Sequence, residues 1–347
     1  MDDQFYLSTK LMSMTLTRRE ILMLGSSLIT SGLMANVDDK PKRNSDGSTL
    51  PGGVLTAALT PLDKNLNADY ARLVKHLQWL LKRGNNGIGL LGTTGEANSF
   101  SVDERKKILE AVLDGGIPPD KLLVGTGCCS VTDTVALSRH AYSKNVGGIL
   151  LLPPFYYKNI TEAGLETYID RVLDKIGENK IQIFLYHFPQ LSGVPFTVSI
   201  IERLIKKYPK NIMGIKDSGG DWPHMEEILK AIPGFRLYTG NEKFLLQVLK
   251  AGGAGTISGN TNLTSPEAAA VYEAWKKGGG EKEQERLSVL SETLRMYQTI
   301  GTMKYIFSKL SGADDWLNVR PPNVILAQEE GFQLEQKLKE INYFKTF

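Results

Sequence analysis

Short apolar runs alternate with longer amphipathic stretches along most of the chain. Each run is bounded by turn residues and has the length of a strand buried on both faces. Between the runs, leucines recur at three- and four-residue intervals, as at 70–82, which is typical of a helix with one apolar face. Ser101 followed by Glu104 predicts a capping box at the start of another helix. In chain order the eight runs are 54–59, 87–91, 122–127, 148–152, 181–186, 212–216, 235–238 and 254–258.

Eight strand-and-helix units in succession predict an α/β fold, a (β/α)8 TIM barrel of parallel strands. No GxGxxG turn follows the first run, which counts against a dinucleotide-binding fold. We assign the barrel to residues 51–278. Apolar periodicity then continues and predicts a C-terminal helical extension over 279–347, with helices at 282–299, 303–310 and 323–343.

The first 50 residues follow a different pattern. Arg18 and Arg19 precede an apolar stretch that ends near residue 35, and this arrangement resembles a twin-arginine export signal. The stretch is short and rich in Ser and Gly, which disfavours a transmembrane helix. Residues 36–49 are polar and charged, with Pro, Gly and Ser, and we expect them to be a linker. We expect export to the periplasm; the alternative is an unstructured leader or a loosely docked helix on a cytoplasmic protein.

Composition excludes several classes of function. The 41 basic and 38 acidic residues leave a net charge of +3 with no basic block, so we expect no nucleic-acid partner and no membrane partner for the mature domain. Cys128 and Cys129 are adjacent and do not have a zinc-ligand spacing. The 4 histidines are scattered, so we expect no metal site. If the protein is exported, we expect both thiols to be buried and unreactive.

The sixth run carries the first candidate for chemistry. It ends at Lys216 and Asp217, before a Ser-Gly-Gly turn. Because side chains alternate along a strand, Lys216 shares a face with Ile212 and Gly214. If that face is the barrel interior, the amine lies in an enclosed space, where burial frees an amine to form an imine with a ketone. The alternative is a lysine that reaches solvent or pairs with Asp217.

The other candidates also follow runs, because the reacting groups of such barrels lie at the carboxyl ends of strands. After the second run, Thr93 and Thr94 lie in a Gly-Thr-Thr-Gly turn, whose hydroxyls and backbone N–H groups suit a small carboxylate. Tyr186 ends the fifth run, where its hydroxyl is placed to move a proton. The alternatives are a plain turn and core packing. Further candidate segments are the aromatic cluster at 153–157, Asn241 with Glu242, and Ile257 with Ser258.

Four motifs occur together and in order: GTTGE at 92–96, PPFYY at 153–157, YxxP at 186–189 and GIKD at 214–217. The combination resembles the dihydrodipicolinate synthase / N-acetylneuraminate lyase superfamily of Schiff-base, pyruvate-type aldolases. The resemblance covers about residues 52–320 and includes GxxK and RPP motifs in the C-terminal extension. It implies a TIM barrel that uses a covalent lysine imine with its substrate and no separate cofactor.

The resemblance also implies roles for individual residues. By motif, Lys216 forms the imine and Tyr186 shuttles protons. Thr93 shares a hydroxyl relay with that tyrosine, and Tyr156 belongs to the same relay, often across a subunit contact in the family. The pyruvyl carboxylate is then held by Thr94 and nearby backbone groups such as that of Gly95.

One position departs from the biosynthetic synthases of the family. They carry an Arg two residues after the Pro of YxxP, where it holds the carboxylate of the second substrate, but this chain has Leu191. The Leu-Ser-Gly ending resembles sialic-acid lyases and some sugar-acid aldolases, and Asn241 and Glu242 lie where those lyases hold a polyhydroxylated substrate. We therefore expect aspartate semialdehyde to be a poorer partner than a neutral polyhydroxy aldehyde. Otherwise another basic residue must reach the site, and His187, which replaces the usual Asn, is the candidate.

Together these features predict a homodimeric or homotetrameric lyase acting on small molecules. It cleaves or forms a sugar-acid-type 2-oxo acid, with pyruvate as product or donor and an aldehyde as the other partner. Alternatives that use the same imine are a 3-deoxy-2-oxo sugar acid dehydratase and a 4-hydroxy-tetrahydrodipicolinate synthase. A catalytically idle, exported 2-oxo-acid binding protein is the alternative of another class, although binding alone needs no reactive amine.

Overall fold

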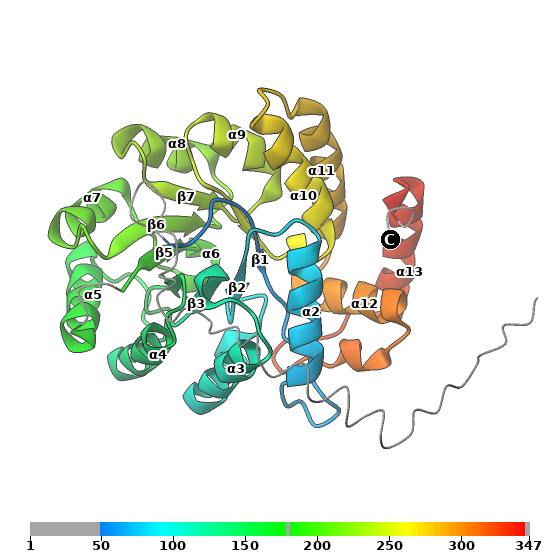
Figure 1. Ribbon diagram of the computed structural model, residues 1–347, viewed down its shortest axis with the longest axis horizontal. Helices are drawn as coiled ribbons and strands as arrows, with labels where there is room; N and C mark the ends of the chain where they lie inside the picture. The colour runs from blue at the N-terminus through cyan, green and yellow to red at the C-terminus, as the bar shows by residue number, and fades with distance from the viewer. Residues whose placement is uncertain (1–48, 178–180, 344–347) are drawn as a thin grey trace, which may run out of the picture. The chain divides into compact units, whose positions relative to one another are not determined.

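The computed structural model describes residues 49–177 and 181–343, and within them eight parallel strands close into a barrel. Each strand pairs with the next along the chain, and β1 also pairs with β8 (Figure 1). The predicted (β/α)8 barrel is thereby confirmed. With the labels of Figure 1, the strands are β1 Gly53–Ala57, β2 Gly87–Leu90, β3 Leu122–Gly125, β4 Gly148–Leu151, β5 Ile183–His187, β6 Ile212–Asp217, β7 Arg236–Thr239 and β8 Gly255–Ser258.

Helices surround the barrel and begin where the sequence supplies caps (Figure 1). The side chain of Asp69 accepts a hydrogen bond from the backbone N–H of Arg72 at the start of α2. Ser101 and Glu104 form the predicted capping box of α3. The helices of the barrel are α2 Tyr70–Lys82, α3 Val102–Asp114, α4 Val131–Ser143, α5 Glu162–Ile176, the short α6 Pro189–Ser192, α7 Val198–Lys207, α8 Trp222–Ala231, α9 Leu245–Lys250 and α10 Thr261–Trp275.

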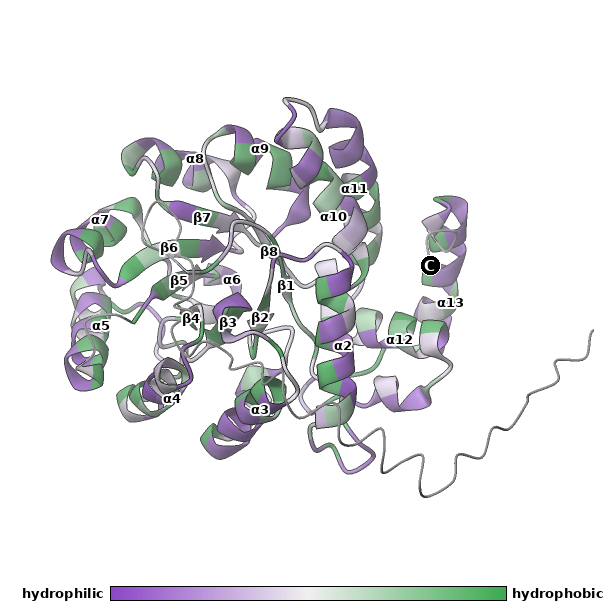
Figure 2. Cartoon of the chain, in the orientation of Figure 1, coloured by the Kyte–Doolittle hydropathy of each residue, from purple (hydrophilic) through white to green (hydrophobic). Residues whose placement is uncertain are grey.

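Apolar side chains fill two layers. One cluster lies inside the barrel and includes Leu55, Leu123, Leu150, Phe184 and Tyr238. A larger cluster joins the outward side chains of the strands to the helices. The outer helices carry both hydrophobic and hydrophilic residues, as Figure 2 shows, so one face of each can pack inward while the other meets solvent.

The C-terminal extension contains α11 Glu281–Leu294, α12 Thr299–Ser311 and α13 Gln328–Glu340. The predicted helix at 282–299 was too long. It ends after Leu294, and the backbone of Gln298 is extended (φ −60°, ψ 121°) before α12 begins at Thr299. This break places Arg295 and Gln298 in the wall of the pocket described below.

Buried and half-buried ion pairs fasten the extension to the barrel. The amine of Lys304 on α12 is bonded to the carboxylate of Glu96 in the loop after β2. That carboxylate also accepts the backbone N–H of Arg320 at 2.8 Å, and the Arg320 guanidinium pairs with Glu104 at 2.6 Å. The GxxK and RPP motifs therefore join the extension to the GTTGE loop.

The candidate export signal lies outside the described residues, and the domain division 1–50, 51–278 and 279–347 stays a prediction. Within the part of the chain that the structure describes, no helix has both the length and the apolar character needed to cross a membrane.

Candidate active site

Lys216 and Tyr186 face each other at the carboxyl ends of neighbouring strands. They are register partners on β6 and β5, and each is 4% exposed. The Lys216 Nζ atom lies 4.3 Å from the centroid of the Tyr186 ring, and the Tyr186 hydroxyl is hydrogen-bonded to Thr93 Oγ1 at 3.2 Å. The expected proximity of these three side chains is therefore present in one chain.

Asp217 is not the partner of Lys216. Its side chain lies on the opposite face of β6, where Oδ2 is 2.7 Å from His224 Nδ1. Within residues 49–177 and 181–343, no carboxylate forms an ion pair with Lys216. The lysine side chain is buried and forms no ion pair with Asp217. The two alternative interpretations, a lysine that reaches solvent and one that pairs with Asp217, therefore do not describe its position.

These side chains line a pocket of about 350 Å³ at the carboxyl ends of the strands. The volume is that of a small-molecule site. Leu191 and Phe188 line one part of the wall, and the rest is largely polar. The polar side chains that join Lys216, Tyr186 and Thr93 there are Thr94, Ser218, Ser258, Asn260, Arg295, Gln298, Thr299 and Asn323.

The loop after β2 supplies Thr94, the candidate carboxylate ligand, to the wall of this pocket. A Cβ atom added to Gly259 would lie 2.7 Å from Thr94 Oγ1, so a glycine is needed there to leave room for that hydroxyl. Gly95 does not line the pocket. Its carbonyl accepts a hydrogen bond from Thr60 Oγ1 at 2.8 Å, which anchors the loop from behind.

Two predicted substrate ligands lie elsewhere. Glu242 is fully buried, and its carboxylate accepts hydrogen bonds from Thr264 Oγ1 at 2.8 Å and Ser291 Oγ at 2.6 Å. Asn241 uses its side-chain oxygen to accept the backbone N–H of Lys243 at 3.2 Å. Neither side chain lines the pocket in the described chain, because both cap and brace local structure, so the geometry gives no support for a role of this pair in substrate binding.

Of the remaining candidates at the strand ends, one lines the pocket and two do not. Ser258 lines the pocket, but Ile257 belongs to the apolar cluster inside the barrel. Tyr156 is 73% exposed and packs edge-on against Tyr157, with ring centroids 5.2 Å apart, away from the pocket. In one chain it is therefore not part of the Thr93–Tyr186 pair, and a role in the relay would need a second subunit.

Arg295 is the principal residue that sequence reasoning missed. It follows α11, lines the same pocket as Leu191 and donates from Nη2 to the carbonyl of Gly240 at 3.1 Å. No acidic side chain in the described ranges pairs with it. Leu191 supplies no cation at its own position, but Arg295 supplies one to the same pocket. The apolar periodicity of the sequence did not single out Arg295, because this residue lies inside the helix predicted at 282–299.

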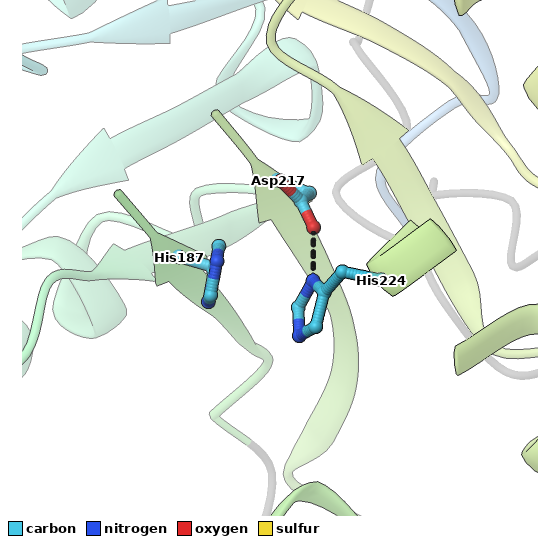
Figure 3. A group of neighbouring side chains, drawn as sticks. All are labelled: His187, Asp217 and His224. Carbon is cyan, nitrogen blue, oxygen red and sulfur yellow. Dashed lines mark hydrogen bonds and ion pairs between the residues drawn. The ribbon is translucent and has the colours of Figure 1, made fainter. Parts of the chain in front are cut away.

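His187, the candidate for a further basic residue in the site, does not line the pocket. It lies with Asp217 and His224 on the outer side of β5 and β6 (Figure 3). A metal would need free ring nitrogens, but His224 uses both, toward Asp217 and toward the carbonyl of Phe196 at 2.9 Å. His187 Nδ1 accepts the Phe196 N–H, so the proton of its neutral ring is on Nε2. These contacts suit a hydrogen-bonded relay better than a metal centre.

The adjacent cysteines are only half-buried, whereas full burial was expected for an exported protein. Cys128 Sγ accepts a hydrogen bond from the Arg105 guanidinium at 3.2 Å. Burial nevertheless raises the pKa of the Cys128 thiol, which disfavours the reactive thiolate at neutral pH.

Comparison with known proteins gives the family. Residues 50–341 match the Dihydrodipicolinate synthetase family. A protein named an uncharacterized DapA-like lyase, from Chloroflexus aurantiacus, is 34% identical over 81% of this chain and 93% of its own length. Dihydrodipicolinate synthase from Agrobacterium tumefaciens has a similar structure, with a TM-score of 0.77, 29% identity and coverage of 83% of this chain and 99% of that one.

A third relative is YagE from Escherichia coli K12, which is named a putative 2-dehydro-3-deoxy-D-gluconate aldolase. Its crystal structure in complex with pyruvate has a TM-score of 0.76 and 25% identity, and the match covers 84% of this chain and 99% of that one. The family match agrees with the four motifs, with the barrel and with the pocket at the carboxyl ends of its strands. The chain is a lyase of the dihydrodipicolinate synthetase family.

Proposed function

We propose that the chain is a class I aldolase that cleaves or forms a sugar-acid-type 2-oxo acid through an imine on Lys216. The observation that carries this proposal is the buried, unpaired amine of Lys216 against Tyr186, whose hydroxyl is bonded to Thr93 at 3.2 Å. The pyruvate complex of the similar protein YagE supports pyruvate as the shared product or donor. We propose no metal and no separate cofactor.

The reaction follows from these groups. The Lys216 amine attacks C2 of the 2-oxo acid, and water leaves as the imine forms. The protonated imine withdraws electrons from the C3–C4 bond. For cleavage, the C4 hydroxyl loses its proton to the Tyr186–Thr93 pair, the bond breaks and an aldehyde departs. The remaining enamine takes a proton at C3, and hydrolysis of the imine releases pyruvate and the free amine.

The pocket wall supports a hydroxylated substrate. Thr94 and the backbone near it would hold the carboxylate next to C2, as in the motif-based expectation. Ser218, Asn260, Gln298 and Asn323 offer further donors and acceptors along the wall, where the hydroxyl groups of a sugar acid need partners. We assign these side chains the role that the sequence gave to Asn241 and Glu242.

Arg295 favours a second candidate function, the condensation of pyruvate with a carboxylate-bearing aldehyde such as aspartate semialdehyde. A carboxylate in the pocket needs a cation, and a guanidinium can donate two hydrogen bonds to it. Leu191 cannot do this, but Arg295 lines the same pocket and has no acidic partner among the described residues. Its position supports the synthase alternative more than the sequence alone did.

Steady-state assays separate the two candidates. Purified protein is incubated with a panel of 2-oxo sugar acids, and pyruvate release is measured. In the synthetic direction, kcat/KM is compared for pyruvate with a neutral polyhydroxy aldehyde and with aspartate semialdehyde. The sugar-acid proposal predicts pyruvate release and preference for the neutral aldehyde; preference for aspartate semialdehyde would favour the second candidate. Lys216→Arg should abolish every one of these activities, because arginine stays protonated and cannot attack a carbonyl.

The exposed aromatic pair also supports a homo-oligomer. Tyr156 and Tyr157 are 73% and 72% exposed, and large apolar surface of this kind is typical of a protein contact. We propose that a second copy of the chain covers them. Sedimentation equilibrium tests this, with a dimer or tetramer expected and a monomer at micromolar concentration contradicting it.

A further inference from the structure

Behind the candidate catalytic pair lies a second pair of facing side chains. Tyr186 is the register partner of Lys216, and His187 is that of Asp217. Because successive side chains of a strand point to opposite faces, His187 and Asp217 lie on the outer side of the same two strands. His224, from α8, packs against both of them (Figure 3).

The hydrogen bonds assign the protons of this group. His224 Nδ1 lies 2.7 Å from Asp217 Oδ2, and Nε2 lies 2.9 Å from the carbonyl oxygen of Phe196. Both neighbours are acceptors, so both ring nitrogens donate, and His224 is an imidazolium paired with the Asp217 carboxylate. The neutral ring of His187 stacks on it, with centroids 4.2 Å apart and planes inclined by 23°.

Backbone groups of Phe196 and Gly219 are hydrogen-bonded to the side chains around this ion pair. Phe196 donates its N–H to His187 Nδ1 at 3.1 Å and accepts from His224 through its carbonyl oxygen. The other Asp217 carboxylate oxygen accepts the N–H of Gly219 at 2.8 Å. The Asp217 side chain is 0% exposed and that of His224 is 17% exposed, so the pair holds the end of β6 with the carboxylate shielded from water.

We infer that His224 is a positioning residue, which holds Asp217 and thereby fixes the end of β6 so that Lys216 meets Tyr186 and the substrate. This inference rests on imine formation at Lys216. His224 touches neither substrate nor the reacting amine and acts through the strand. Misplacement of a reacting group by about 1 Å costs on the order of a hundredfold in rate, so small movements of the strand end are sufficient.

The arrangement depends on pH in a defined direction. Burial opposes a charge on His224, but the hydrogen bond and the charge of Asp217 outweigh it and raise the pKa of His224 above its ordinary value; Asp221, at the start of α8, acts in the same sense. Burial lowers the pKa of His187 to about 4. Because the pKa of His224 is raised by folding, its protonation stabilises the fold. This contribution is fully present below the unfolded-state pKa of about 6.5 and is lost as pH rises through the folded-state pKa.

The test measures imine formation at saturating pyruvate as a function of pH, by borohydride trapping at Lys216. His224→Gln keeps one N–H donor but removes the charge. In the unaltered protein, we expect the trapping rate to fall at alkaline pH as His224 loses its charge. In His224→Gln, trapping near pH 7 should slow about tenfold, the pyruvate concentration for half-maximal trapping should change less than about threefold, and the alkaline fall should be absent. Asp217→Asn should have the same effect, and the double variant should be no worse than either single variant.

His140→Gln is the matched control. His140 also faces a carboxylate, Glu110 at 3.0 Å, but on the outer surface of α4 and α3. This variant should trap pyruvate at the unaltered rate. Nitrogen-15 NMR of the His224 ring gives a readout that does not depend on activity, and it should show both nitrogens protonated at pH 6.

The outcomes distinguish the two proposals. A neutral His224 ring at pH 6, or trapping in His224→Gln equal to that of the unaltered protein with the same pH profile, would overturn the inference alone. Unaltered protein that is not labelled at Lys216 would overturn the aldolase mechanism and the inference with it. Loss of thermal stability in His224→Gln without slower trapping would reduce His224 to a structural residue and also overturn the inference.

Discussion

Replacing Lys304 by Met should destabilise the protein strongly, although the residue lies outside the pocket. The side chain of Lys304 is 1% exposed and that of its partner Glu96 is 0% exposed. In Lys304→Met, the Glu96 carboxylate remains buried and keeps the Arg320 N–H at 2.8 Å but loses its cation. Breaking a buried ion pair in this way costs about 3–5 kcal/mol. Most proteins have only about 5–15 kcal/mol of stability, so the loss is a large fraction of the whole.

Urea unfolding followed by circular dichroism measures the loss. The double variant Glu96→Gln, Lys304→Met should recover part of it, because a neutral pair leaves no charge buried without a partner. The surface pair of Arg72 and Asp315, at 2.8 Å, is the matched control, since it also joins the extension to the barrel, in this case to α2. Asp315→Asn should cost only about 0–1 kcal/mol.

Because Glu96 ends the GTTGE loop, Lys304→Met should also slow imine trapping in protein that remains folded. The reasoning would be refuted if Lys304→Met cost less than about 1 kcal/mol, or if the double variant lost the sum of the two single losses.

Three further predictions concern the pocket and the leader. Tyr186→Phe should lower kcat on the order of 10²–10⁴-fold and slow trapping without eliminating it, measured by pyruvate release; a loss below about threefold would return this side chain to core packing. Arg295→Gln should lower kcat/KM for aspartate semialdehyde about ten- to a hundredfold and leave a neutral aldehyde nearly unchanged, whereas Leu191→Arg should improve aspartate semialdehyde selectively; equal effects on both aldehydes would contradict a carboxylate contact. Replacing Arg18 and Arg19 together by Lys should retain the protein in the cytoplasm, measured by cell fractionation; unprocessed protein in the cytoplasm before the change would defeat the export proposal.

The barrel could be predicted because each parallel strand must be covered on both faces, which leaves a short apolar run in the sequence. The positions of Lys216 and Tyr186 could be predicted from the sequence for a related reason. Strand alternation fixes the face of each residue, and the active edge of a barrel is the carboxyl edge. These local rules, together with the four motifs, were sufficient to predict that Lys216, Tyr186 and Thr93 lie close together.

The same rules could not place side chains whose partners are distant in the chain. Glu242 follows β7 at the expected edge, but Ser291, 49 residues later, draws its carboxylate inward and away from the pocket. Arg295 reaches the pocket because the helix breaks before Gln298, and apolar periodicity does not reveal a short break of this kind. His224 could not be identified from the sequence, because its role depends on contacts with Asp217 on β6 and with Phe196 in the segment between α6 and α7.

The most direct test of the proposed mechanism is covalent labelling of Lys216. Borohydride reduction in the presence of pyruvate, followed by peptide mass spectrometry, should add a reduced pyruvyl group to the peptide that contains this residue, and Lys216→Arg should remove the label while the protein stays folded. Lys304 is an internal control, because its amine is equally buried but is bonded to Glu96 and to the carbonyl of Asn318 at 2.7 Å. Label at Lys304 or another lysine, or none in the unaltered protein, would contradict the imine mechanism.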